Sequence, residues 1–257
     1  MITKRILYKL LGVKNYLVVI SRMFFVSYDL GLLKNNRTFD CHYFIKKLIY
    51  KGDHIIDIGA NLGYYSRLFA KLAGPEGKVL SVEPVTLFRK ILKFNTSRYK
   101  NTTIVPFALG SEDNKEILMG IPKSNKYLRH GLTRVLENSE NEPFEFTFTE
   151  KMFTPLSLFG NIEKCDYIKC DVEGYESHIV PQLGFILNKF HPVIQIEMEP
   201  ENRRSIIKYL ATFTYSAFYL EREFLLPVGN EPETIYGDFF FVPKDRMKIA
   251  APYFKKI

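Results

Sequence analysis

The sequence predicts an α/β fold, in which a mostly parallel sheet is covered by helices on both faces. From residue 53 onward, short apolar segments alternate with amphipathic ones, as in chains that wind between strands and helices. A glycine turn follows the first apolar segment, and Gly74-Pro75 ends the first amphipathic segment. With 257 residues, 46% of them hydrophobic, the chain is long enough to bury one substantial core.

Each element follows from the local pattern. Strands are predicted at 54–58, 78–82, 102–109, 167–171, 193–197, 217–220 and 238–242. Helices are predicted at 64–72, at 87–99, from near 175 and at 203–213. The stretch 110–162 is less regular, with a strand-like piece at 144–149 and a polar segment, Glu137–Glu142, that is typical of a surface loop.

Positive charge is concentrated at the N-terminus. The whole net charge of +8 comes from residues 1–51, which carry ten Lys and Arg and two acids. We therefore divide the chain into a basic amphipathic helical arm, 1–50, and a neutral domain, 51–257. Arg22 interrupts the apolar run of the arm, which leaves it short of the ~20 apolar residues of a membrane span. The arm either caps the domain and helps cover a ligand, which we favour, or contacts an anionic membrane at the inner face.

The cysteines indicate a cytoplasmic protein. Cys41, Cys165 and Cys170 form an odd number without the spacing of a metal site. We expect them to be reduced thiols, two of them within one strand segment of the core.

The glycine turn indicates the kind of ligand. Residues Asp57–Gly63 read D-I-G-A-N-L-G, so the turn lacks the second glycine that a pyrophosphate needs in the G-x-G-x-x-G fingerprint. Asp57 ends the preceding strand, where a carboxylate repels phosphate and binds an ammonium. These features favour S-adenosylmethionine, which carries an amino group and a sulfonium but no phosphate, over a nicotinamide dinucleotide.

The next strand ends contribute further ligand-binding candidates. Glu83 lies 24 residues after Gly59, where a carboxylate can accept hydrogen bonds from both ribose hydroxyls. Phe107 and Ala108 close the third strand and are predicted to flank the adenine. The expected cofactor-binding residues are Asp57, Gly59, Ala60, Asn61, Gly63, Tyr64, Ser66, Glu83, Pro84, Phe107, Ala108 and Asp171.

Acids at two later strand ends are candidates for a catalytic base. Asp171 and Glu173 flank one turn, and Glu197 ends the next strand, so these carboxylates can meet at one opening. Their mutual repulsion would raise the pKa of at least one of the three. His130, in the irregular segment, is a second candidate base. The carboxylate oxygens of Asp171, Glu173 and Glu197 could also bind Mg²⁺. We favour the alternative that these acids are held by hydrogen bonds, and we expect no metal.

Taken together, these residues resemble the FkbM family of methyltransferases over about residues 53–243. The matching segments, in order, are Asp57–Gly63, Tyr65-Ser66, Glu83-Pro84, Val105–Gly110, Thr154–Leu158, Lys169–Glu176, Ile196-Glu197 and Asp238–Val242. The resemblance implies a Rossmann-like class I methyltransferase fold with a seven-stranded sheet, and O-methylation of sugars or natural-product hydroxyls. The family often has T-L-D where this chain has Thr154-Pro155-Leu156, and often a histidine where this chain has Glu199. The second departure shifts the role of base to Asp171, Glu173 or His130.

The expected activity is therefore transfer of the sulfonium methyl group, by direct displacement, to a hydroxyl of a glycan or related small molecule. A nicotinamide-dependent oxidoreductase is the first alternative, and the turn sequence argues against it. A non-catalytic nucleoside-binding protein on the same fold is the second, and the intact cofactor residues argue against it. Nucleic acid is not expected as a partner, because the domain is neutral and offers no basic track.

Overall fold

The computed structural model describes residues 2–124, 128–136 and 143–255. An eight-stranded sheet lies at its centre, in the order β11-β10-β12-β9-β8-β1-β2-β3. Its strands are β1 (His54–Ile58), β2 (Lys78–Val82), β3 (Thr102–Val105), β8 (Tyr167–Cys170), β9 (Val193–Ile196), β10 (Tyr215–Glu221), β11 (Phe224–Pro227) and β12 (Phe239–Pro243). The strands from β3 to β9 are parallel, and β12, β10 and β11 continue the sheet in antiparallel pairs.

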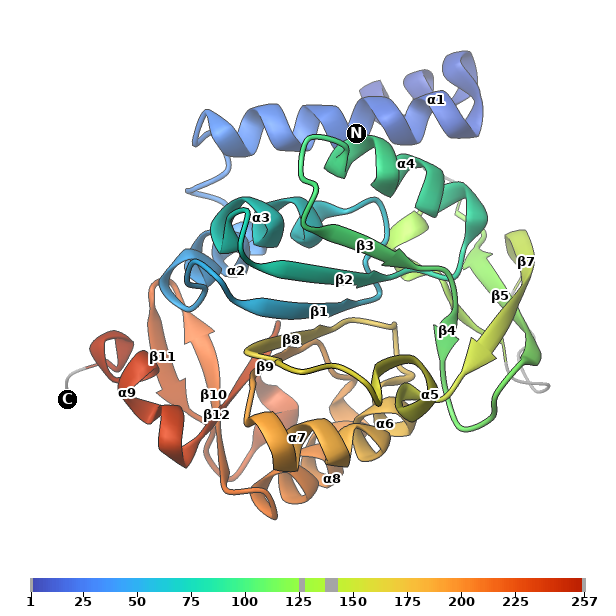
Figure 1. The fold of residues 1–257 in the computed structure, drawn as a ribbon. Helices are drawn as coiled ribbons and strands as arrows, with labels where there is room; N and C mark the ends of the chain where they lie inside the picture. Colours follow the sequence, from blue (N-terminus) through green and yellow to red (C-terminus); the bar gives the residue numbers. More distant parts are fainter. Residues whose placement is uncertain (1, 125–127, 137–142, 256–257) are drawn as a thin grey trace.

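Helices cover both faces of this sheet, as the sequence predicts (Figure 1). One face carries α2 (Asp40–Phe44), α3 (Tyr64–Ala73) and α4 (Thr86–Thr96). The other carries α5 (Pro155–Phe159), α6 (Glu176–Ile179), α7 (Gly184–Phe190) and α8 (Pro200–Ala211). A short α9 (Met247–Ala250) follows β12, and α1 (Ile2–Asp29) lies outside α3 and α4. The α/β prediction is confirmed, with eight strands instead of seven because β11 folds back on β10 as an edge hairpin.

The predicted strand at 102–109 is wrong, because it is broken at Pro106. Proline lacks the N–H that a strand interior donates, so β3 stops at Val105. The chain then enters a second sheet, of order β4-β7-β5-β6. Its strands are β4 (Ala108–Leu109), β5 (Lys115–Pro122), β6 (Arg134–Val135) and β7 (Phe144–Phe153). The piece predicted at 144–149 is the first part of β7, whereas the predicted loop Glu137–Glu142 lies outside the described residues.

Alternate residues of the central strands face opposite layers, which creates a polar row inside the protein. Ile56 and Ile58 pack on the α6–α8 side, and Ile55 packs on the α3 side. On the α3 side, the strand registers place Asp57 beside Ser81 of β2 and beside Lys169 of β8. Lys169 in turn is in register with Gln195 of β9. Four polar side chains thus cross the sheet in one line, immediately before the strand ends.

The N-terminal segment packs on the domain. Tyr16, Leu17 and Phe25 of α1 are buried, and Asn95 Nδ2 of α4 donates a hydrogen bond to Ser21 Oγ at 3.0 Å. Asp29 forms ion pairs with Arg67 and Lys71 of α3. Further along, residues 44–49 contribute four buried apolar side chains to the cluster that contains α3. Much of the segment is therefore continuous with the core.

Gly59 permits the closest approach between the two central strand ends. Its φ is +80°, and a Cβ there would lie 1.8 Å from the carbonyl oxygen of Asp171. Only glycine accommodates both the left-handed backbone and this contact. The turn after β1 and the turn after β8 can therefore touch.

Replacing Gly59 by Ala should strongly destabilise the protein, because it adds a backbone clash to the strain of positive φ. Gly52→Ala is the matched control, since Gly52 has φ +84° with no atom within 4 Å of the added methyl group. We expect the control to lose about 1 kcal/mol and Gly59→Ala at least ~2 kcal/mol more, as measured by urea denaturation. Equal losses for the two variants would show that the close approach to Asp171 is not required.

Candidate active site

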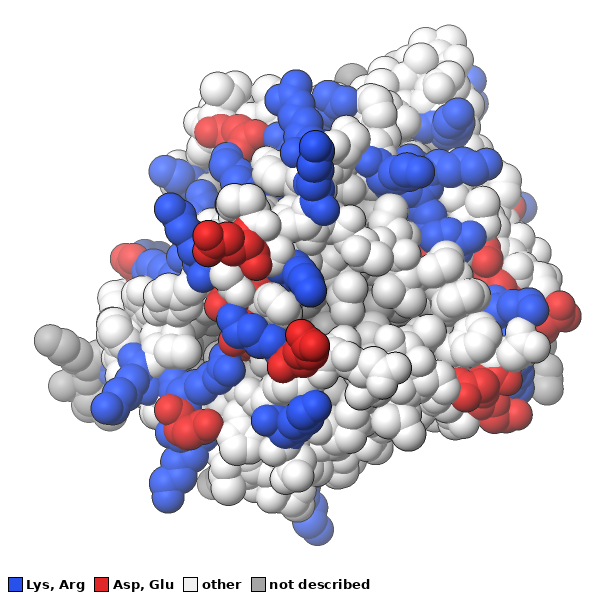
Figure 2. All heavy atoms as spheres, viewed as in Figure 1, with Lys and Arg blue, Asp and Glu red and all other residues white. Residues whose placement is uncertain are grey.

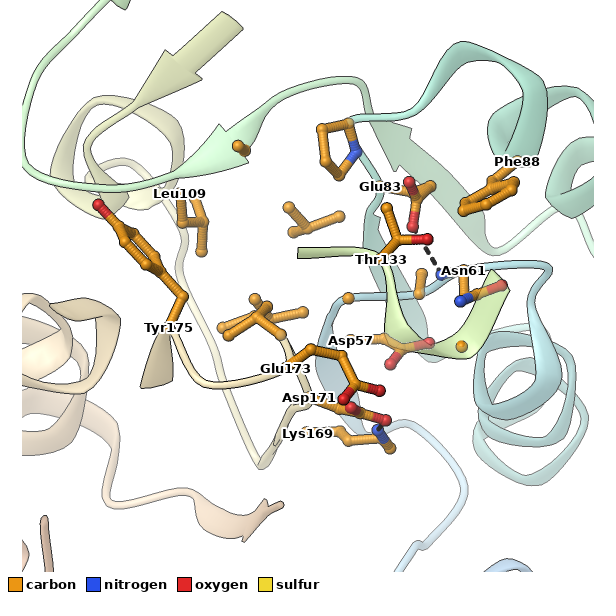
Figure 3. Close-up of a pocket in the computed structure, with 18 of the residues that line it drawn as sticks. Asp57, Asn61, Glu83, Phe88, Leu109, Thr133, Lys169, Asp171, Glu173 and Tyr175 are labelled. Carbon is orange, nitrogen blue, oxygen red and sulfur yellow. Dashed lines mark hydrogen bonds and ion pairs between the residues drawn. The ribbon is translucent and has the colours of Figure 1, made fainter. Parts of the chain in front are cut away.

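A cavity of about 230 Å³ lies where β1, β2 and β8 end (Figure 3). Its wall comes mainly from the glycine turn, the end of β2, the segment 130–135 and the segment 169–175, and residues of α2, α3, α4, β4, β5 and α6 complete it. Because parallel strands end on the same edge of a sheet, this is the position at which such folds bind ligands. The cavity is therefore the candidate active site.

Asp57 presents an unsatisfied acceptor at the base of this cavity. The side chain is 1% exposed, and its Oδ2 accepts a hydrogen bond from Ser66 Oγ at 2.5 Å. Oδ1 is buried and has no hydrogen-bond partner among the described residues. Burial raises the pKa of Asp57 to about 6, against the opposing effect of the Lys169 ammonium. Burying an ionised carboxylate without a partner for Oδ1 costs free energy, and a cationic ligand that donates a hydrogen bond to Oδ1 would offset that cost.

Glu83 is held by two backbone amides at the end of β2. Its Oε2 accepts from the N–H of Asn61 at 2.8 Å (Figure 3). Its Oε1 accepts from the N–H of Val85, also at 2.8 Å. Burial nevertheless raises the pKa of Glu83 to about 7, because the carboxyl is only 4% exposed. The amides fix its orientation, and each carboxylate oxygen can accept a further hydrogen bond.

Lys169 belongs to the polar row and also binds Asp171, the first acid after β8. Its Nζ donates to Asp171 Oδ2 at 2.7 Å and lies 4.5 Å from the centre of the Tyr65 ring. Burial alone lowers the pKa of an ammonium, but the carboxylates of Asp171, Asp238 and Asp57 outweigh it and raise the pKa of Lys169. Lys169 is therefore a buried cation whose charge is matched by surrounding acids.

Glu173 lines the cavity, and its pKa is raised further than those of Asp57 and Glu83. Burial, and then the negative charges of Asp171 and Glu197, raise its pKa to about 8. The residue adopts φ +54°, in the left-handed region that non-glycine residues rarely occupy. Glu176 holds this turn, because its carboxylate accepts hydrogen bonds from the N–H groups of Val172 and Gly174. The backbone strain thus places Glu173 against the cavity.

The other two predicted catalytic residues occupy different positions. His130 lines the cavity, but it contacts Tyr64 and Phe88 on the wall that also carries Glu83. Glu197 is exposed and does not line the cavity. The cavity lies where β8, β1 and β2 end, and Glu197 follows β9, which is the next strand along the sheet. Nearby protein atoms still desolvate its carboxyl, and together with Asp171 and Asp238 they raise the pKa of Glu197 to about 7.

Three of the residues predicted to bind the cofactor do not line the cavity. Ser66 is fully buried beneath Asp57 and orients it. Gly63 faces α4, since a Cβ there would meet Leu92 at 2.6 Å. Phe107 packs against Phe153, with ring centres 4.4 Å apart, because the break at Pro106 directs it away. The remaining nine line the cavity: Asp57, Gly59, Ala60, Asn61, Tyr64, Glu83, Pro84, Ala108 and Asp171.

The structure adds lining residues that were not among the sequence candidates. Lys169 and Tyr65 both lie within segments quoted for the family resemblance, and the alternation of strand residues places Lys169 on the same side as Asp57. His42 comes from α2, and its ring stacks on Tyr65 at 4.1 Å. Burial and the Lys169 charge lower the pKa of His42 to about 3, so the ring is neutral. No local sequence pattern indicated that residue 42 reaches this cavity.

No cluster of three or more His, Cys, Asp or Glu side chains suited to a metal ion occurs among the residues that the structure describes. The thiols of Cys41, Cys165 and Cys170 are free, and the latter two are buried.

The raised pKa of Glu173 predicts a change in stability with pH. A carboxyl with a folded pKa near 8 and an unfolded pKa of ~4.3 binds its proton more tightly when folded. Its contribution is fully present below the unfolded pKa and is lost as pH rises through the folded pKa. Glu173→Gln should therefore gain free energy of unfolding relative to wild type between pH 5 and 8.5, in urea titrations without ligand. The exposed Glu199→Gln serves as the control and should track wild type. A Glu173→Gln curve parallel to wild type would show that Glu173 ionises normally.

Comparison with known proteins places this site in a family. The family model described as the methyltransferase FkbM domain matches residues 57–218. The FkbM methyltransferase of Methylobacillus flagellatus is 13% identical, with TM-score 0.46, over 77% of this chain and 47% of that one. Aeropyrum pernix fibrillarin with bound S-adenosylmethionine is 12% identical, with TM-score 0.45, over 76% of this chain and 68% of that one. No curated protein matches. Because the model spans more than half of the chain, this protein belongs to the FkbM family and is an S-adenosylmethionine-dependent methyltransferase.

Proposed function

We propose that this enzyme methylates a hydroxyl group of a sugar, in a glycan or a related small molecule. The observation that carries the proposal is Glu173, a carboxyl with pKa about 8 that lines the cavity beside Asp171. A hydroxyl loses its proton as it accepts a methyl group, and a base works best when its pKa is close to the working pH. Glu173 meets this requirement.

The cavity residues fit the cofactor. Asp57 Oδ1, buried without a partner, is suited to the cofactor's ammonium group. Glu83, fixed by two backbone amides, is suited to the ribose hydroxyls. Phe88, Ala108 and Leu109 supply an apolar wall for the adenine. When bound, S-adenosylmethionine supplies a methyl group activated by the adjacent sulfonium.

Glu173 and Asp171 then act on the acceptor. Glu173 takes the hydroxyl proton on its carboxylate, and the left-handed backbone, which costs ~1–3 kcal/mol, fixes its position. Asp171, paired with Lys169, is a positioning residue that orients the acceptor. Much of the rate acceleration would come from this alignment, since oriented groups reach effective molarities of ~10⁵ M or more.

A polyhydroxylated acceptor suits the polarity of the cavity. Thr133, Asp171, Glu173 and Tyr175 all line the cavity. Asp171 and Glu173 lie together, whereas Thr133 lies beside Glu83 and Tyr175 beside Leu109 (Figure 3). The resemblance to the FkbM family supports the same class of acceptor. The free thiols support a reducing compartment, and we propose that the enzyme acts in the cytoplasm.

Two substitutions should separate cofactor binding from catalysis. Glu83→Gln should weaken the affinity for S-adenosylhomocysteine at least ~10-fold, because a carboxylate is a stronger acceptor than an amide. Glu173→Gln should leave that affinity nearly unchanged and lower kcat by ~10²–10⁴. In wild type, kcat should rise with pH up to about 8, as Glu173 loses its proton.

The measurements are calorimetry for affinity, and mass spectrometry of a sugar and glycan panel incubated with the isotope-labelled methyl donor. The exposed Glu199→Gln is the matched control and should retain wild-type kcat and affinity. Label on nitrogen or carbon only, or an unchanged kcat in Glu173→Gln, would contradict O-methylation with Glu173 as the base.

A further inference from the structure

The outward face of α1 is unusually apolar. Of the twelve large hydrophobic side chains exposed among the described residues, six lie between residues 6 and 32. Met23 and Val26 of α1 and Leu30, one residue past its end, follow one another at intervals of three and four residues. The N–H of Leu30 still donates to the carbonyl of Val26, as in a helix, so the three side chains form one stripe. Leu10, on the other side of the kink at Gly12, is also exposed, at 76%. A contiguous apolar surface of this kind marks an interaction site.

Basic side chains flank this stripe. From Ile6 to Asp29 in α1, and over residues 86–100, the chain carries eight Lys and Arg but only one acid, Asp29. That acid is already paired with Arg67 and Lys71. Arg89 is already paired with Glu150, which leaves seven basic side chains. Figure 2 shows Lys and Arg gathered over the upper part of the molecule, where α1 and α4 lie. The complementary partner is therefore apolar and negatively charged at once.

A small hollow between α1 and α4 brings these features together. It encloses about 120 Å³ and includes Arg22, Phe94 and Arg98. The Arg22 guanidinium lies 4.3 Å from the centre of the exposed Phe94 ring. An arginine held in this way beside aliphatic side chains is suited to the phosphate of a lipid headgroup.

By length and composition, Ile6–Asp29 could also cross a bilayer, with a window of mean hydropathy 1.4 of which 22% is buried. Packing argues against that arrangement. Crossing would expose the buried side chains of Tyr16, Leu17 and Phe25 and separate Ser21 from Asn95. It would also place Arg22 within the hydrocarbon. A helix with one face buried in protein and the other apolar and basic is suited to the interface plane.

We propose that α1 docks the folded enzyme on the surface of an anionic lipid bilayer, with Met23, Val26 and Leu30 in the interface and Arg22 and Arg98 on lipid phosphates. This surface is separate from the cavity, so the inference does not depend on the proposed acceptor.

The test is co-sedimentation of the full chain with phosphatidylcholine vesicles, with and without phosphatidylglycerol. We expect binding only to the anionic vesicles, and weakening as salt is added. The triple variant Met23→Gln, Val26→Gln, Leu30→Gln should lower the partition coefficient at least ~10-fold. Arg22→Gln and Arg98→Gln should each lower it ~5-fold. The control, Leu118→Gln with Leu156→Gln, removes exposed apolar side chains from β5 and α5 and should bind as wild type.

Several outcomes would overturn the proposal. Absence of binding at low salt is one, and equal loss in the control double variant is another. Resistance to alkaline carbonate extraction would show a transmembrane helix, and a dimer abolished by the triple variant would show that a second copy covers this face. Tighter binding to a mixed-sequence oligonucleotide than to vesicles would assign the surface to nucleic acid. Calorimetry with S-adenosylhomocysteine should give wild-type affinity in every variant, which verifies folding and separates this test from that of the proposed methyl transfer.

Discussion

The ion-paired Lys169 is the interaction on which the site depends. Its ammonium is buried beside Asp57 on the neighbouring strand, and it donates to Asp171 just beyond its own strand. A buried cation is tolerated only when nearby acids balance it, and removing one partner of such a group commonly costs ~3–5 kcal/mol. The ends of β1 and β8 are thereby fixed relative to each other, and the contact of Gly59 with Asp171 becomes possible.

The same burial prepares the acids for function. Asp57, Glu83 and Glu173 all have pKa values raised by desolvation, to about 6, 7 and 8. Each carboxyl lies at the cavity, and each costs stability when ionised without a ligand. We propose that the positively charged cofactor offsets part of this cost at Asp57, so that cofactor affinity and the instability of the empty site have one origin. Burial, and then the negative charges of Asp171 and Glu197, raise the pKa of Glu173.

The sequence predicted the parts of this arrangement that follow from local patterns. Strand ends, the glycine turn and the position of Glu83 could be inferred because apolar periodicity locates the strands and parallel strands end on one edge. The sequence did not reveal which side chains reach the cavity. Phe107 turns away because Pro106 breaks the strand, and Glu197 lies one strand too far along the sheet. His42 reaches the cavity only through packing of α2 on Tyr65, a contact between residues far apart in sequence. The second sheet depends similarly on long-range pairing of β5 with β7.

We propose that the Asp57 carboxyl, which is partly protonated in the empty cavity, ionises to hold the cofactor's ammonium group. Calorimetric binding of S-adenosylhomocysteine in buffers of different ionisation enthalpy measures the protons exchanged on binding. At pH 6, where Asp57 with its pKa of about 6 is half protonated, we predict net proton release, which falls toward zero at pH 8. Binding without proton release at pH 6, or with proton uptake, would contradict this role of Asp57.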